Sequence, residues 1–124
     1  MRTPLITHLA AALVAAMLAC GGYPPPVTSP GGDPNVITQA QIAELNVSNA
    51  QDAVRRLRPN WLRSRGVDEE PVVYVDAARR GGTRVLSTIS VEMIEEIRYL
   101  SGPNATTRLG TGHRGGAILI TTRR

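Results

Sequence analysis

The run Val72-Val73-Tyr74-Val75 constrains the fold of this 124-residue chain more than any other feature. It contains only β-branched and aromatic residues, with no polar residue at alternate positions. Such a run is typical of a strand that is buried on both faces, because a strand with one solvated face alternates apolar and polar side chains. We therefore expect a sheet in which residues 72–75 form a central strand.

Helix signals precede this strand. Thr38 is followed three residues later by Gln41, and Ser48 by Gln51, which is the spacing of a capping box at a helix start. We expect a short helix through residue 45 and a second helix that Pro59 ends. The apolar positions of the second helix follow the helical period: Ala50, Ala53, Val54 and Leu57. The lone tryptophan, Trp61, is expected to pack in the core over the end of this helix.

The remaining elements are shorter. We expect a polar loop at 76–83 that is flexible enough to be a hairpin tip, a strand or hairpin at 85–89, and a short helix at 90–96 capped by Ser90. A strand at 97–101, one helical turn at 104–108 capped by Asn104, and a last strand at 117–122 complete the order. The predicted fold class is therefore α/β (α+β), a small domain with a mixed β-sheet and two or three short helices.

The first twenty residues form a separate unit. Arg2 supplies a positive charge, residues 9–19 are apolar, and Cys20 is the only cysteine of the chain. A helix as long as residues 9–19 spans about 17 Å, short of a bilayer core of roughly 30 Å, so we expect a cleaved signal. Residues 17–20 resemble a bacterial lipoprotein signal, which implies a lipidated Cys20. An ordinary secretory signal is the alternative.

These signals divide the chain into three parts. Residues 1–19 are the expected lipoprotein signal peptide, and residues 20–35 hold the lipidated Cys20 and a flexible tether rich in proline and glycine. Residues 36–122 form the predicted domain. It has no cysteine for a disulfide, and a domain of this size has a stability on the order of 5 kcal/mol.

Composition and motifs argue against several function classes. All 14 basic residues are arginine, against 10 acidic ones, a balance that suits anionic lipid or another polyanion. An exported chain makes nucleic acid an unexpected partner. The letters Gly110-x-Gly112-x-x-Gly115 match a dinucleotide fingerprint, but these glycines precede a strand and not a helix. We expect them to allow positive φ in a tight bend.

The sequence also contains no convincing motif for catalysis or metal binding. His113 has no second histidine or cysteine near it in the sequence, so no metal site is predicted. Three glutamates, Glu92, Glu95 and Glu96, suit the start of the predicted short helix better than acid and base catalysis. We therefore expect a protein that is not an enzyme and that has no cofactor.

Several ordered segments resemble the plug domain of TonB-dependent outer-membrane receptors. Residues 72–76 are similar to the family's "V-V-D-G" strand, residues 94–105 to "I-E-x-I-E-V-x-x-G-P-x-A", and residues 115–122 to the closing "G-x-I-x-I-x-T" strand. Residues 50–57 look like the preceding "D-A-L-x-x-L-P-G" helix. Ala77 and Leu109 depart from the usual Gly and Tyr. The resemblance implies a plug-like domain at 36–122, here in a small stand-alone lipoprotein that lacks the receptor's barrel.

The expected function is a non-catalytic, membrane-anchored binding or docking module of the bacterial outer envelope, linked to TonB-dependent uptake. A basic lipoprotein that binds a membrane surface or polyanion is the alternative. The candidate binding residues lie in predicted loops: Arg79, Arg80, Arg84, His113 and Arg114. The expected partners are the membrane, through the lipid on Cys20, and an outer-membrane barrel or another envelope protein. The expected location is the outer membrane, facing the periplasm or the cell surface.

Overall fold

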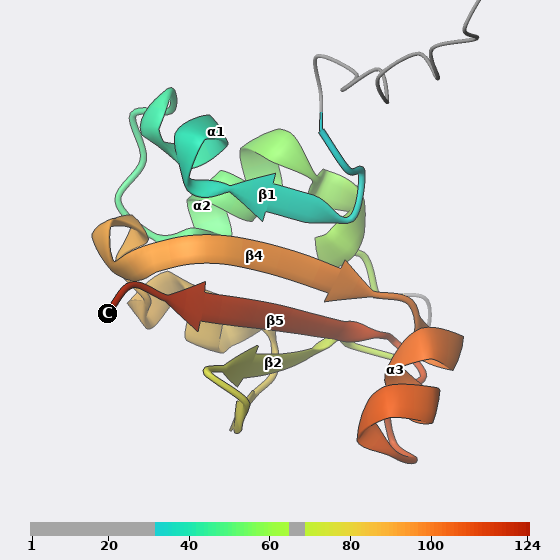
Figure 1. The fold of residues 1–124 in the computed structure, drawn as a ribbon. Helices are drawn as coiled ribbons and strands as arrows, with labels where there is room; N and C mark the ends of the chain where they lie inside the picture. The colour runs from blue at the N-terminus through green and yellow to red at the C-terminus, as the bar shows by residue number, and fades with distance from the viewer. Residues whose placement is uncertain (1–31, 65–68) are drawn as a thin grey trace, which may run out of the picture.

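The structure is a computed structural model that describes residues 32–64 and 69–124 (Figure 1). The strands are β1 (Val36–Thr38), β2 (Val72–Val75), β3 (Ala78–Gly81), β4 (Ile94–Leu100) and β5 (Ala117–Thr122). The helices are α1 (Gln39–Ala43), α2 (Ala50–Leu57) and α3 (Gly102–Leu109), with 3-10 helices η1 (Pro59–Leu62), η2 (Thr83–Thr88) and η3 (Val91–Met93). The predicted signal, Cys20 and most of the tether lie outside the described residues. The predicted class, a small α+β domain with a mixed sheet, is confirmed.

The five strands form one sheet in the order β1-β4-β5-β2-β3. Only β2 and β5 run parallel, and the other neighbours are antiparallel. The last strand, β5, therefore lies in the middle, between β4 and β2. The predicted strand at 72–75 is β2, an inner strand of the sheet, and the predicted strand at 117–122 is β5.

The main core lies on one face of the sheet. In the view of Figure 1, α2 lies behind the sheet, whereas α3 follows β4 at the end of the sheet. The buried residues of this core are Ile37, Ile42, Ala50, Ala53, Val54, Trp61, Val73, Leu86, Ile94, Ile97, Ile118 and Ile120. Trp61 is 5% exposed and stacks on Tyr99 with ring centroids 5.5 Å apart, which confirms its predicted core position.

The opposite face of the sheet has a smaller buried cluster beside α3, formed by Leu100, Ala105 and Ala117. Tyr74 and Leu119 pack against this cluster and are partly buried. Cross-strand pairing places Arg98 opposite Leu119, and Tyr74 opposite Arg79. Paired residues project to the same face, so this face carries two arginines beside its apolar residues.

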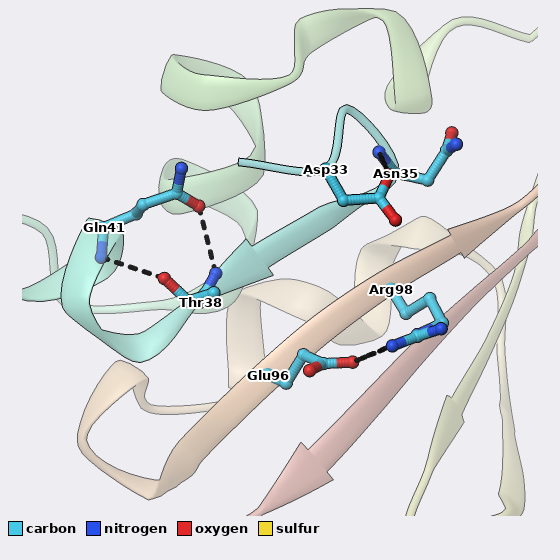
Figure 2. A network of polar contacts seen from close by, with 6 residues as sticks. All are labelled: Asp33, Asn35, Thr38, Gln41, Glu96 and Arg98. Atoms are coloured by element: carbon cyan, nitrogen blue, oxygen red, sulfur yellow. Dashed lines mark hydrogen bonds and ion pairs between the residues drawn. The ribbon is translucent and has the colours of Figure 1, made fainter. Parts of the chain in front are cut away.

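One of the two predicted capping boxes is correct. At the start of α1, the Gln41 amide donates to Thr38 Oγ1 at 3.4 Å and the Thr38 amide donates to Gln41 Oε1 at 3.1 Å (Figure 2). The second box is wrong by one residue, because Asn49 caps α2 and its Oδ1 accepts from the Asp52 amide at 2.9 Å. Ser48 instead accepts, through its carbonyl, a hydrogen bond from the Val91 amide. This contact keeps Ser48 outside the helix.

The polar segment at 76–83 is not a loop throughout. Residues 78–81 form β3, which pairs with β2 through a tight turn at Asp76 and Ala77. Both turn residues have positive φ, 46° and 69°, as the twist of a two-residue hairpin requires. The arginines of β3 are compatible with a strand because β3 is an exposed edge, where charged side chains oppose pairing with another chain.

Two further elements differ from the prediction. Residues 85–89 were expected as a strand or hairpin, but they belong largely to η2, whose Leu86 is fully buried. The helix expected at 90–96 is limited to η3, and Ser90 makes no side-chain cap. Ile94 already pairs with Thr122 of β5, so the sheet takes residues 94–96 away from the helix.

The segment after β4 is a longer helix than predicted. α3 begins at Gly102 and spans eight residues, with Pro103 in the first turn, where the missing amide hydrogen has no helical partner to lose. In the loop 110–116 that follows, Gly110, Gly112 and Gly116 have positive φ, so the prediction of positive φ is confirmed for Gly110 and Gly112 and is wrong for Gly115. A Cβ atom at Gly115 would overlap the carbonyl of Glu69, so the loop also packs closely against the chain that enters β2.

Candidate functional site

The β2–β3 hairpin and the loop at 110–116, here called the glycine loop, border a common hollow of about 330 Å³. We call it the hairpin hollow. Its lining residues are Glu70, Pro71, Val72, Arg79, Gly81, Gly82 and Gly112. The two segments come from distant parts of the sequence and meet because β2 and β5 are parallel neighbours. A hollow between a hairpin and a loop is a place where binding residues are common.

Glu70 forms the acidic wall of the hairpin hollow. Its Oε1 accepts a hydrogen bond from the Thr83 amide at 2.7 Å and another from the Thr83 hydroxyl. These hydrogen bonds lower the pKa of the Glu70 carboxyl below its ordinary value, and the charge of Arg84 lowers it further. Glu70 is therefore held in its charged form, and it links the entry of β2 to the start of η2.

The two adjacent arginines of β3 do not act at the same place. Arg79 is exposed, lies opposite Tyr74 and lines the hairpin hollow. Arg80 lines a separate hollow of about 300 Å³, beside Val75 and the exposed Met93. This separation follows from strand geometry, since successive side chains point to opposite faces.

His113 is part of the structure beneath the site. It is only 4% exposed, and its Nδ1 lies 2.8 Å from the Gly110 carbonyl oxygen. Its Nε2 lies 2.8 Å from the Tyr74 hydroxyl. A neutral ring satisfies both contacts by donating from Nδ1 and accepting at Nε2. His113 thus ties the glycine loop to β2, and its ring is not exposed to a partner.

The other two predicted residues lie on different sides of the glycine loop. Arg84 is exposed at the start of η2, where its charge acts on Glu70 near the hairpin hollow. Arg114 is exposed, and its carbonyl would overlap a Cβ atom at Gly102, so it lies beside the start of α3. Of the five predicted residues, the fold therefore brings Arg79 and Arg84 toward one hollow. Sequence reasoning missed Glu70, which has no recognisable motif around it.

A second carboxylate fixes the hairpin to the sheet. Asp76 Oδ1 accepts from the Thr122 amide at 2.9 Å, and Oδ2 accepts from the Thr122 hydroxyl. These hydrogen bonds lower the pKa of Asp76 below its ordinary value, with smaller contributions from Arg124 and Arg80. The turn that presents Arg79 is thereby held to the end of β5.

The arrangement suits recognition of an acidic group. A guanidinium presents several donors in a plane and binds a carboxylate or phosphate through two parallel hydrogen bonds. Within residues 32–64 and 69–124, no three His, Cys, Asp or Glu side chains come together as a metal site. Within the same residues, no helix has the length and apolar character needed to cross a bilayer.

The fold is similar to part of a receptor of known structure. The siderophore receptor PirA from Acinetobacter baumannii matches 72% of this chain with a TM-score of 0.52 and 20% sequence identity. The match covers 17% of the receptor chain, so this chain corresponds to a small part of that protein. No protein-family model matches the chain, and no curated protein sequence matches it. At this identity the similarity shows a shared fold.

Proposed function

We propose that this protein is a non-catalytic docking module of the bacterial outer envelope, anchored by lipid on Cys20 and linked to TonB-dependent uptake. The observation that carries the proposal is the fold, since 72% of the chain superposes on part of a siderophore receptor. The plug-like sequence segments at 72–76, 94–105 and 115–122 support the same family relationship. In this proposal, the predicted tether places the domain near an outer-membrane barrel.

The hairpin hollow is the proposed contact surface for that barrel or another envelope protein. Arg79 is exposed in the hollow, Arg84 is exposed near it, and Glu70 is already engaged by Thr83. Exposed guanidinium groups bind acidic side chains of a partner through paired hydrogen bonds. His113 and Tyr74 hold the glycine loop in place beside them. The surface is an edge of the sheet with its arginines outward, which suits docking through side chains.

The experiment that tests this proposal is site-directed photocrosslinking in intact cells. A photoreactive amino acid replaces Arg79 in the full chain, and a matched variant carries it in place of Arg56, which is exposed on α2. Crosslinked products are purified and identified by mass spectrometry. A third version adds Cys20→Ala, which removes the proposed site of lipidation.

We expect a barrel protein to crosslink at position 79 and not at position 56, and Cys20→Ala to abolish the product. A product of equal intensity at both positions contradicts the proposed surface. Crosslinking to lipid or glycan alone contradicts the docking role and supports the basic, polyanion-binding alternative. A product that persists in Cys20→Ala contradicts the lipid anchor alone.

A further inference from the structure

A second polar hollow lies toward the β1 edge of the sheet, away from the β3 edge that carries the hairpin hollow. It has a volume of about 270 Å³ and forms where the entry to β1, the end of β4 and α3 meet. The polar residues that matter in it are Asp33, Asn35, Arg98, Asn104 and Arg108. Neither the predicted binding residues nor the proposed docking surface includes any of them. We call it the β1–α3 hollow.

Arg98 lines this hollow and is paired with Glu96. Its Nε and Nη2 atoms both lie 3.0 Å from Oε1 of Glu96, two residues earlier on β4 (Figure 2). This ion pair holds one edge of the guanidinium group. Among the described residues, Nη1 has no hydrogen-bond or ion-pair partner, so the other edge keeps its donors for a ligand. A guanidinium that is held along one edge loses less side-chain entropy on binding.

The second cation comes from α3. Asn104 and Arg108 are four residues apart and therefore share one face of the helix, which lines the hollow. Arg108 is exposed and has no hydrogen-bond or ion-pair partner within the described part of the chain. Two arginines from separate elements thus face one small volume. Like charges placed this way are stabilised by an oxyanion between them.

The entry to β1 adds complementary groups. Asp33 Oδ1 accepts from the Asn35 amide at 2.8 Å, which leaves Oδ2 as an acceptor toward the hollow. The Asn35 and Asn104 side chains supply both donors and acceptors. A carboxylate beside two arginines disfavours a bare anion but accepts hydrogen bonds from hydroxyl groups. The lining therefore matches a ligand that joins an oxyanion to hydroxyls.

We infer that the β1–α3 hollow binds the phosphate ester of a small polyol. Arg98 and Arg108 bind the phosphate, whose three terminal oxygens accept donors from several directions, and Asp33 binds the hydroxyl groups. The same glycerophosphate chemistry has two sources, a soluble polyol phosphate and the headgroup of phosphatidylglycerol. Asp33 lies near the end of the predicted tether, within about 45 Å of extended chain from Cys20, so both sources are within reach if the proposed anchor holds. The soluble source does not depend on that anchor.

The first test is calorimetric titration of the full chain, in a non-ionic detergent, with glycerol 3-phosphate and with glycerol as the uncharged control. The variants are Arg108→Gln and Arg98→Gln. Arg56→Gln is the matched control, because it removes the same charge from an exposed position on α2 outside both hollows. Thermal unfolding of each variant shows whether it is folded, and Asn104→Ala provides a neutral change in the same lining.

We expect Arg108→Gln and Arg98→Gln to weaken glycerol 3-phosphate binding about tenfold or more, the size expected for a lost charge-assisted hydrogen bond. Arg56→Gln should leave the affinity unchanged, and Asn104→Ala should weaken it less. No binding to the wild-type chain, equal loss in Arg56→Gln, or equal binding of glycerol overturns the inference.

Flotation of the Cys20→Ala chain, which lacks the proposed lipid, with phosphatidylcholine vesicles that do or do not contain phosphatidylglycerol distinguishes the two sources. Flotation that requires phosphatidylglycerol and is lost in Arg108→Gln supports the lipid headgroup. Flotation that is independent of phosphatidylglycerol, together with specific binding of glycerol 3-phosphate, supports the soluble ligand. Flotation that Arg56→Gln reduces as strongly as Arg108→Gln shows general charge attraction and overturns the assignment.

Discussion

Alanine substitutions in the glycine loop separate two ways in which a side chain destabilises this loop: backbone strain at positive φ, and steric overlap of the Cβ atom with neighbouring backbone. Gly110 has φ 95° and ψ −174°, a backbone region that is essentially restricted to glycine, but a Cβ atom there meets nothing within 4 Å. Gly115 lacks positive φ, yet its Cβ would overlap the carbonyl of Glu69. Gly116 combines both problems, with φ 91° and an overlap with the carbonyl of Leu100. The three positions therefore report backbone strain, steric overlap and their combination.

The expected magnitudes follow from these geometries. Strain at Gly110 costs about 1–3 kcal/mol, and alanine offsets about 0.4–1 kcal/mol by restricting the unfolded chain, so Gly110→Ala should destabilise by about 1 kcal/mol. Overpacking against backbone at Gly115 should cost about 3 kcal/mol. Gly116→Ala should cost about 4 kcal/mol, which is most of a total stability on the order of 5 kcal/mol.

The assay is urea unfolding of the full chain, followed by the fluorescence of its single tryptophan, Trp61. Because Trp61 is buried against Tyr99, its emission should change on unfolding. The free energies of unfolding should decrease in the order wild type, Gly110→Ala, Gly115→Ala, Gly116→Ala. Equal stability of Gly110→Ala and Gly116→Ala would refute the reasoning, because the two share positive φ and differ in steric overlap.

Three further predictions use the same assay. Leu86→Ala, which empties a fully buried position in η2, should destabilise by about 2–5 kcal/mol, and a loss below 1 kcal/mol would contradict its place in the core. Ala77→Gly should stabilise by about 0.5 kcal/mol, because φ 69° costs alanine roughly 1–2 kcal/mol; an unchanged or lower urea midpoint would count against that strain. Folding lowers the pKa values of Glu70 and Asp76 below their ordinary values of 4.5 and 3.8. Their hydrogen bonds therefore stabilise the fold fully above these ordinary pKa values, and this stability is lost as the pH falls through the lower pKa values of the folded protein. In the Glu70→Gln, Asp76→Asn double variant, the urea midpoint should fall less steeply as the pH is lowered than it does in the wild type. An equally steep fall in both proteins would show that these two carboxylates do not cause the loss of stability in acid.

The parts of the fold that could be predicted are those whose signal is local and strong. The apolar runs at 72–75 and 117–122 give strands because they are too short and too rich in β-branched residues for buried helices. The capping box at Thr38 and the stop near Pro59 act within one helical turn. These signals needed no knowledge of the neighbouring chain.

The missed elements depend on pairing between distant segments. Residues 78–81 look like a loop from their arginines and become a strand because β2 offers a partner and the edge tolerates charge. Ser90 and the following glutamates resemble a helix start, but pairing of Ile94 with Thr122 overrides this preference. The N-cap of α2 is Asn49 and not the adjacent Ser48. Local sequence could not distinguish the two, because asparagine and serine are both favoured at the N-cap position.

The candidate site was predictable only by residue type. Arg79 and Arg84 were selected as loop arginines, and the fold places both near the hairpin hollow. His113 was selected in the same way, but its ring binds the Tyr74 hydroxyl across 39 positions of sequence. No spacing pattern encodes such a contact. The arginines of the β1–α3 hollow were missed for the same reason, since β4 and α3 meet the entry to β1 only after the sheet has formed.

The position of β5 has a consequence for how the protein acquires its structure. Because β4 and β2 both pair with β5 and not with each other, the β1–β4 pair and the β2–β3 hairpin are joined into one sheet only by residues 117–122. Synthesis from the N-terminus therefore makes both strand pairs before the strand that joins them. The five-stranded sheet depends on contacts between segments far apart in the sequence, which is the kind of topology that folds slowly.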